Sequence, residues 1–181
     1  MRVLGLDPGS RRTGWGIIER RGNHYTAVAF GQASVAASLP LPNRLHALAE
    51  CIGTIMDEHR PQCVAVEEAF YHESVRSTLV LGHVRGALLV AAIARGFEVA
   101  EYSPRAIKLA VVGSGAAAKE QVAFMVRRLL GIQAKLSSDA SDGLAVALCH
   151  LNRAGRVTPV TAAPRSAPGP IHALLARKVR G

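Results

Sequence analysis

The stretch RVLGLDPGS, residues 2–10, decides the fold of this chain, because an apolar strand ends there in an acidic residue and a tight turn. Residues 2–7 are predicted to form a strand, and the Asp-Pro-Gly-Ser run that completes the stretch is typical of a turn. Two further strands are predicted over residues 13–19 and 24–31, on either side of a turn at residues 21–23. An antiparallel meander is the simplest assembly of these three strands.

Helices alternate with strands after the meander. Asn43 is predicted to cap a helix that ends at His59, and Ser74 or Ser77 to cap a longer helix that ends before Gly96. The remaining expected elements are strands at 63–67 or 63–68 and at 97–102, a helix that starts at 103–104 and is broken by residues 112–115, and helices at 117–130 and 139–152. This order predicts an α/β fold with a five-stranded mixed sheet flanked by helices on both faces.

The composition favours a globular protein with a polyanionic partner. Of 181 residues, 49% are hydrophobic and 19% charged, which excludes wholesale disorder and allows a substantial core. The net charge of +9 suits a nucleic acid, although an acidic membrane surface would fit the charge as well. Residues 155–181 hold five basic residues and no acidic one. We expect a flexible, basic, Ala- and Pro-rich tail there, after a domain formed by residues 1–154.

No membrane span is expected. The longest uninterrupted apolar run, residues 87–94, is shorter than the roughly 20 residues that a membrane span needs. The sequence therefore predicts a cytoplasmic protein without a membrane partner.

Four carboxylates stand at strand ends and at a helix start. Asp7 ends the first strand, and Glu67 or Glu68 ends the fourth; these two glutamates must point to opposite faces, so only one can join Asp7. Asp139 and Asp142 open the last helix and share one of its faces, although acidic residues in a first turn are also common as caps. Together these positions indicate a divalent-metal site, because oxygen-only ligation suits Mg²⁺.

A metal site of this kind suggests hydrolysis of a phosphodiester. A pair of metal ions held by carboxylates can lower the pKa of a bound water, orient it for in-line attack and stabilise the departing oxygen. Basic residues are expected to surround the acidic centre and contact the nucleic acid. The candidates are Arg76, Arg85, Arg105, Lys108 and Lys119.

Six motifs, in order along residues 1 to about 152, resemble the RuvC family of crossover (Holliday) junction endodeoxyribonucleases. Several motifs at compatible spacing are more specific than the Asp-Pro-Gly turn alone, because sugar kinases and actin-like ATPases also carry an Asp-Gly loop. The motifs are LGLDPGS at 4–10, TGWG at 13–16, VEEAF at 66–70, LGHVRGA at 81–87, KLAVVGSG at 108–115 and DASDGLA at 139–145.

The resemblance implies an RNase H-like fold and a specific activity. The expected protein is a homodimer that resolves four-way DNA junctions in recombination and repair, through paired symmetric nicks that leave 5′-phosphate and 3′-hydroxyl ends. Lys108 and Lys119 would contact the DNA or steady the scissile phosphate, and Phe70 would stack on an unpaired base. The implied partner is the RuvA-RuvB branch-migration complex. The implied tetrad, which would hold a pair of Mg²⁺ ions with Mn²⁺ as a substitute, is Asp7, Glu67, Asp139 and Asp142.

Three other interpretations stay open. A YqgF-like nuclease of the same fold would cleave RNA, although the Phe70 segment and the spacing of Asp139 and Asp142 favour the junction resolvase. A nucleotide-binding phosphotransferase would cradle a phosphate with residues 7–10, but the sequence offers no second phosphate loop. A DNA-binding module without catalysis would carry purely structural acids. The helix at 75–95, rich in small residues, is either the dimer interface or a helix packed closely on the sheet.

Overall fold

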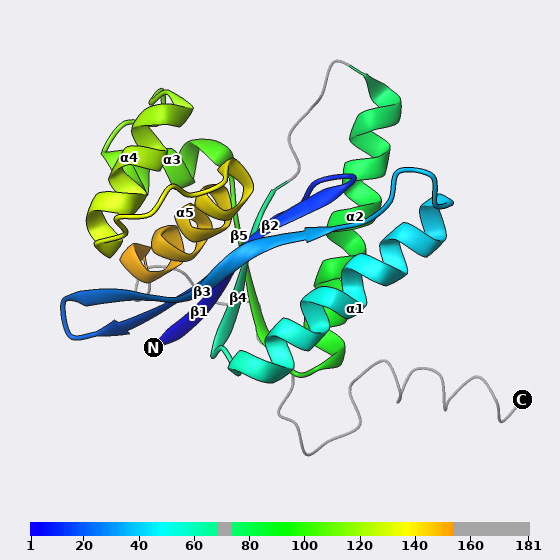
Figure 1. The fold of residues 1–181 in the computed structure, drawn as a ribbon, viewed down its shortest axis with the longest axis horizontal. Coiled ribbons are helices and arrows are strands. Elements are labelled where there is room, and N and C mark those ends of the chain that lie inside the picture. Colours follow the sequence, from blue (N-terminus) through cyan, green and yellow to red (C-terminus); the bar gives the residue numbers. More distant parts are fainter. Residues whose placement is uncertain (69–73, 154–181) are drawn as a thin grey trace, which may run out of the picture.

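The computed structural model of the chain describes residues 1–68 and 74–153. Within them, three strands come first, and helices and strands follow (Figure 1). Phe70 and the predicted tail at 155–181 lie outside the described residues, so the division into a domain and a tail stays a prediction. The elements are β1 (Arg2–Asp7), β2 (Arg12–Arg21), β3 (His24–Ser34), α1 (Leu41–His59), β4 (Cys63–Glu67), α2 (Val75–Ala94), β5 (Glu98–Tyr102), α3 (Pro104–Val112), α4 (Lys119–Leu130) and α5 (Ser138–Arg153).

The strands form one mixed sheet in the order β3-β2-β1-β4-β5. β1, β2 and β3 make the predicted antiparallel meander, whereas β4 and β5 run parallel to β1. The five-stranded mixed sheet is therefore confirmed. Because β1, β4 and β5 point the same way, their carboxyl ends meet at one edge of the sheet, which is where sites form in open α/β folds.

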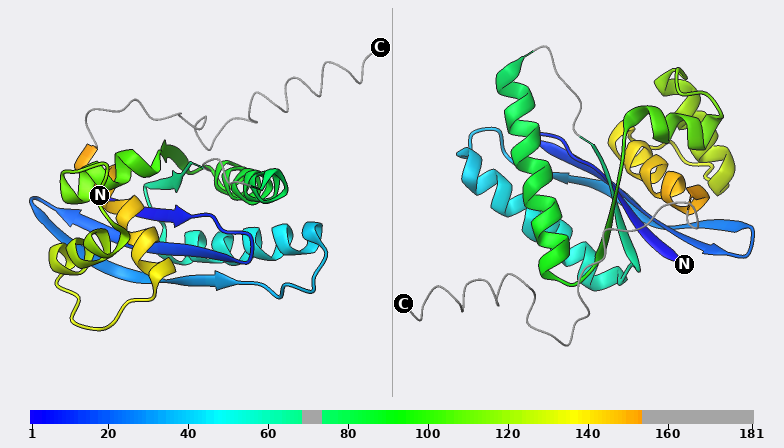
Figure 2. Two further views of the ribbon diagram at one scale, coloured as in Figure 1. Left: turned by 90° about the horizontal axis from the view of Figure 1, so that it is seen from above. Right: turned by 180° about the vertical axis from the view of Figure 1, so that it is seen from behind.

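Helices cover both faces of the sheet, as predicted. Leu4 and Leu6 of β1 belong to a core that includes residues of α1 and α2, while Val3 belongs to a second core that includes α3, α4 and α5. Figures 1 and 2 show α1 and α2 on one side of the sheet and the other three helices on the opposite side. β1 is apolar on both faces because side chains alternate along a strand and each face is covered.

Local signals predicted most helix ends, and the start of α1 is the main exception. Ser74 caps α2 through its side chain, as expected. α1 begins at Leu41 with Pro40 as its cap residue and no side-chain cap, so the prediction that Asn43 caps this helix is wrong. The reason is Pro42, whose fixed φ suits the first helical turn and whose missing N–H is not needed there.

By length and composition alone, α2 could cross a membrane. Its mean hydropathy is 1.6 over an 18-residue window, which the uninterrupted run at 87–94 did not reveal because His83 and Arg85 interrupt the apolar sequence. Val84 and Leu88 are buried in the core beneath the helix, as in a core helix of a globular protein. Only 22% of the window is buried, so α2 also presents a broad apolar surface to its surroundings.

Candidate active site

Asp7 and Glu67 lie together at the carboxyl ends of β1 and β4. Leu6 pairs with Val66 in the parallel ladder, so Asp7 and Glu67 come next on the two strands and line one cavity. The alternation of side chains directs both toward the face that α5 covers. Glu68 is exposed, and its backbone N–H donates a hydrogen bond to β5 at 2.9 Å. The structure thus places Glu67, and not Glu68, beside Asp7.

Glycines bring the first turns of α5 to the end of β1. A methyl group on Gly14 of β2 would overlap the carbonyl oxygen of Asp139, and one on Gly5 of β1 would overlap that of Gly143. The backbone of α5 therefore lies directly on the backbones of two strands, and Asp142 reaches the sheet edge beside Asp7. Sequence reasoning missed this role, although glycine inside a strand is a known signal of close backbone approach.

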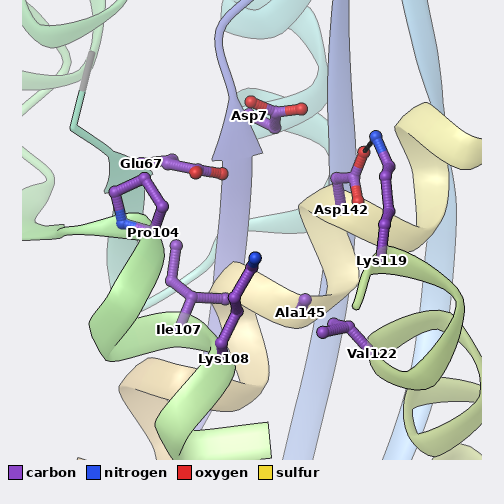
Figure 3. Close-up of a pocket in the computed structure, with 9 residues that line it drawn as sticks. All are labelled: Asp7, Glu67, Pro104, Ile107, Lys108, Lys119, Val122, Asp142 and Ala145. Atoms are coloured by element: carbon purple, nitrogen blue, oxygen red, sulfur yellow. Dashed lines mark ion pairs between the residues drawn. The ribbon is translucent and has the colours of Figure 1, made fainter. Parts of the chain in front are cut away.

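The side chains of five elements meet in a cavity of about 210 Å³, which we call the acidic cavity (Figure 3). Figure 3 shows the amino group of Lys108 pointing toward the space between Glu67 and Asp142. Two basic residues therefore face three acidic ones. The lining residues are Asp7 from β1, Glu67 from β4, Pro104, Ile107 and Lys108 from α3, Lys119 and Val122 from α4, and Asp142 and Ala145 from α5.

Burial and mutual repulsion raise the pKa values of the carboxyl groups in the acidic cavity. Burial raises the pKa of Asp7 to about 7, and the negative charge of Asp142 adds to the rise. Burial likewise raises the pKa of Glu67 to about 8, with a further rise from the charge of Asp7. The charges of Lys119 and Lys108 oppose these rises only in part, and a bound cation would supply further positive charge.

Lys119 forms an ion pair with Asp142 inside the acidic cavity. Its Nζ lies 2.7 Å from a carboxylate oxygen of Asp142, and this hydrogen bond raises the pKa of Lys119. Burial raises the pKa of Asp142 even though Lys119 opposes that rise. Asp142 is therefore engaged by the ammonium group of Lys119.

The donor set fits a hard cation, although the carboxylates are not gathered into a complete ligand shell. Oxygen-only ligands from Asp7, Glu67 and Asp142 suit Mg²⁺. Asp139 is half-buried and is not among the residues that line the acidic cavity, but its charge raises the pKa of both Asp7 and Asp142. Within residues 1–68 and 74–153, no three acidic, histidine or cysteine side chains lie close enough together to hold an ion. Side-chain rotation, starting with release of Asp142 from Lys119, would be needed to complete such a shell.

None of the three candidate arginines is among the residues that line the acidic cavity. Arg85 forms an ion pair with Glu101 of β5. The side chain of Arg105 packs on Gly115. Arg76 lies at the start of α2, in a different pocket. Lys108 and Lys119 are therefore the predicted basic residues that the structure brings to the carboxylates.

Comparison with known proteins identifies the family of this chain. The family model described as crossover junction endodeoxyribonuclease RuvC matches residues 3–150. The chain belongs to the RuvC family. A RuvC of Caulobacter vibrioides, named crossover junction endodeoxyribonuclease, is 47% identical over 151 residues, which are 83% of this chain and 89% of that protein.

Solved RuvC structures have the same fold. The structure of Thermus thermophilus RuvC superposes with a TM-score of 0.80 at 34% identity, over 88% of this chain and all of that one. T. thermophilus RuvC in complex with a Holliday junction substrate gives a TM-score of 0.78 at 31% identity, over 88% of this chain and 98% of that one. The RNase H-like fold of the RuvC family is thereby confirmed, and all four predicted acidic positions fall inside the matched span.

Proposed function

We propose that this protein is a structure-selective endonuclease that resolves four-way DNA junctions in recombination and repair by paired, metal-dependent nicks. The observation that carries the proposal is the meeting of Asp7, Glu67 and Asp142 in one cavity of a RuvC-family chain. The net charge of +9 suits a DNA partner. Nicking of both opposed strands leaves 5′-phosphate and 3′-hydroxyl ends that can be ligated.

The catalytic set consists of the acidic tetrad and two lysines. Asp7, Glu67 and Asp142 would hold the metal as ionised carboxylates. Asp139, one turn before Asp142 on α5, completes the tetrad. Mg²⁺, as a pair of ions for which Mn²⁺ substitutes, supplies Lewis-acid stabilisation of the charge that develops on the phosphate.

The lysines act on the scissile phosphate. Lys119, once released from Asp142, contacts a non-bridging oxygen and balances its charge. Lys108 approaches the same phosphate from α3, where its side chain also lines the acidic cavity. Phe70 is proposed to stack on an unpaired base at the crossover, on the strength of the VEEAF motif alone.

A second copy of the chain supplies the second nick. The outer face of α2 carries Val75, Leu79 and Val90 with side chains 67%, 60% and 69% exposed, and exposed apolar surface of this kind marks an interface. A two-fold dimer built on α2 relates two active sites with the symmetry that a four-way junction requires. The family resemblance further supports a cytoplasmic protein that works with the RuvA-RuvB complex.

The deciding experiment compares labelled substrates with Mg²⁺ and with chelator. We expect paired symmetric nicks on a four-way junction, none on linear duplex or an RNA hairpin, and none with chelator or in the Asp7→Asn protein. Cleavage confined to RNA would favour a YqgF-like nuclease instead. Junction binding without cleavage in any divalent metal would favour a non-catalytic DNA-binding module, and nicking by Asp7→Asn would refute the metal mechanism.

A further inference from the structure

A second pocket lies at the same edge of the sheet as the acidic cavity. It has a volume of about 460 Å³ and forms where the loop after β1 meets the first turns of α1 and α2. Figures 1 and 2 show these three segments together from opposite sides of the molecule. We call it the basic pocket, and it is lined by Gly9, Ser10, Arg11, Arg44, Arg76, Ser77, Val80 and Leu81.

Three arginines from three different elements meet in the basic pocket without an acidic residue among its lining. Arg11 comes from the loop, Arg44 from α1 and Arg76 from α2. In the part of the chain that the structure describes, no carboxylate lies within ion-pair distance of any of the three. Like charges gathered in this way repel one another, and no described carboxylate offsets them, so the pocket suits an anion.

Arg44 connects two segments of the pocket and has a hydrogen-bond donor left over. Its Nη1 donates to the carbonyl oxygen of Ser10 at 3.0 Å, which ties α1 to the loop. The loop is tied again on its other side, where the backbone N–H of Val35 donates to the carbonyl of Arg11 at 3.0 Å. The Nε of Arg44 is buried and has no hydrogen-bond partner in the described part of the chain. A buried donor of this kind indicates a missing acceptor.

Two helix starts add to the positive potential. Ser77 belongs to the first turn of α2, and Arg44 to the first turn of α1. Neither first turn contains an acidic residue, so no carboxylate within either turn offsets the partial positive charge of the helix start. Guanidinium groups beside such a helix start suit the oxygens of a phosphate.

We propose that the basic pocket binds a backbone phosphate of the DNA junction, apart from the phosphate that is cut. The proposal rests on the proposed function and extends it with Arg11 and Arg44, in addition to Arg76. Ser10 follows Asp7 by only three positions, so the DNA crosses one edge of the sheet and contacts the acidic cavity on the α5 face and the basic pocket on the α2 face. Contact on both sides fixes the register of the DNA without reading its sequence.

The first measurement is the salt dependence of junction binding in chelator, where no cleavage occurs. The Arg11→Ala/Arg76→Ala protein is expected to show a plot of log Kd against log salt that is shallower by about one for each lost phosphate contact. The control is Arg21→Ala/Arg60→Ala, which removes the same charge from exposed arginines outside the basic pocket. Equal slopes in the wild type and the Arg11→Ala/Arg76→Ala protein, or an equal loss in the control, would overturn the proposal.

The second measurement locates the phosphate. Single phosphates of the junction are replaced in turn by neutral methylphosphonates, and Kd is measured for each substrate. We expect one position away from the cut at which the replacement weakens wild-type binding and leaves the Arg11→Ala/Arg76→Ala protein unaffected. Equal weakening of both proteins at every position would overturn the proposal. The proposal would also be overturned if inorganic phosphate raised the unfolding temperature through the basic pocket while the variants left junction affinity unchanged.

Nicking by the wild type with Mg²⁺ separates this proposal from the proposed function. If the wild type nicks the junction and the variants bind it as tightly as the wild type, the phosphate-binding role of the basic pocket is refuted and the proposed function stands. A wild type that neither binds nor nicks the junction refutes the proposed function, and the basic pocket with it. Arg44→Lys, which keeps the charge and loses the guanidinium fork, should weaken binding even if Arg44→Ala fails to fold.

Discussion

Gly14→Ala tests how α5 is held against the sheet. A methyl group at position 14 would overlap the backbone carbonyl of Asp139, which cannot move unless the first turn of α5 moves with it. Overpacking of this kind costs about 1–3 kcal/mol, so a domain with an ordinary stability of about 5–15 kcal/mol stays folded. Asp142 lies on the same displaced helix, and a misplacement of about 1 Å lowers catalysis about 100-fold. We therefore expect a folded protein whose nicking is about 100-fold slower.

Urea unfolding gives the stability of the Gly14→Ala protein, and single-turnover nicking of a labelled junction gives its rate. Junction binding in chelator checks that DNA affinity is retained. The control is Thr26→Ala, because that side chain is exposed on β3 and lies outside both the acidic cavity and α2. A Gly14→Ala protein with wild-type stability and wild-type nicking would refute the close approach of α5 to β2.

Four further outcomes are expected. In chelator, the folded state keeps protons on Asp7 and Glu67 up to about pH 7 and 8, while the unfolded chain loses them near 3.8 and 4.5. Because the folded state binds more protons in this range, the free energy of unfolding should fall between about pH 4 and 8. A urea series without that fall would contradict the raised pKa values. Mg²⁺ should reduce this fall, because it binds the ionised carboxylates of the folded state, and an identical urea series with Mg²⁺ and chelator would contradict metal binding. Lys119→Ala should shift the pH at which nicking is half-maximal upward, because the charge of Lys119 lowers the pKa of Asp7 and Glu67; an unchanged pH profile would exclude that role. Leu79→Asp or Val90→Asp should convert a dimer to monomers in sedimentation, whereas the same change at Val28, on exposed β3, should not.

Much of the fold followed from local rules. Short apolar runs bounded by turn residues predicted the strands, because turn residues stop a strand locally. Gly131 ends α4 with a φ of 63°, a left-handed conformation that glycine adopts readily because it has no Cβ. Such signals act over a few residues, so they can be read from the sequence directly. Pro42 shows the limit of these signals: Asn43 is a good cap residue, but the helix begins before it because Pro42 favours the first helical turn.

The candidate site was predictable in its residue types and in part of its geometry. Asp7 and Glu67 meet because parallel strands place their carboxyl ends together, a rule that needs only the order of the elements. The alternation rule allowed just one of Glu67 and Glu68 to join Asp7, and the structure brings Glu67 to the cavity. The roles of these residues in catalysis remain the proposal made above.

The sequence by itself determined the α/β class, the mixed sheet and the positions of the acids along the chain, because periodicity and turn chemistry are local. Only the tertiary structure decided which charges face each other: Lys119 pairs with Asp142 inside the acidic cavity, while Arg85 pairs with Glu101 away from it. It also decided that Arg11 and Arg44 share a pocket with Arg76. Distances between groups far apart in the chain depend on how closely backbones pack, and here glycines that carry no chemistry set the approach of α5 to the sheet.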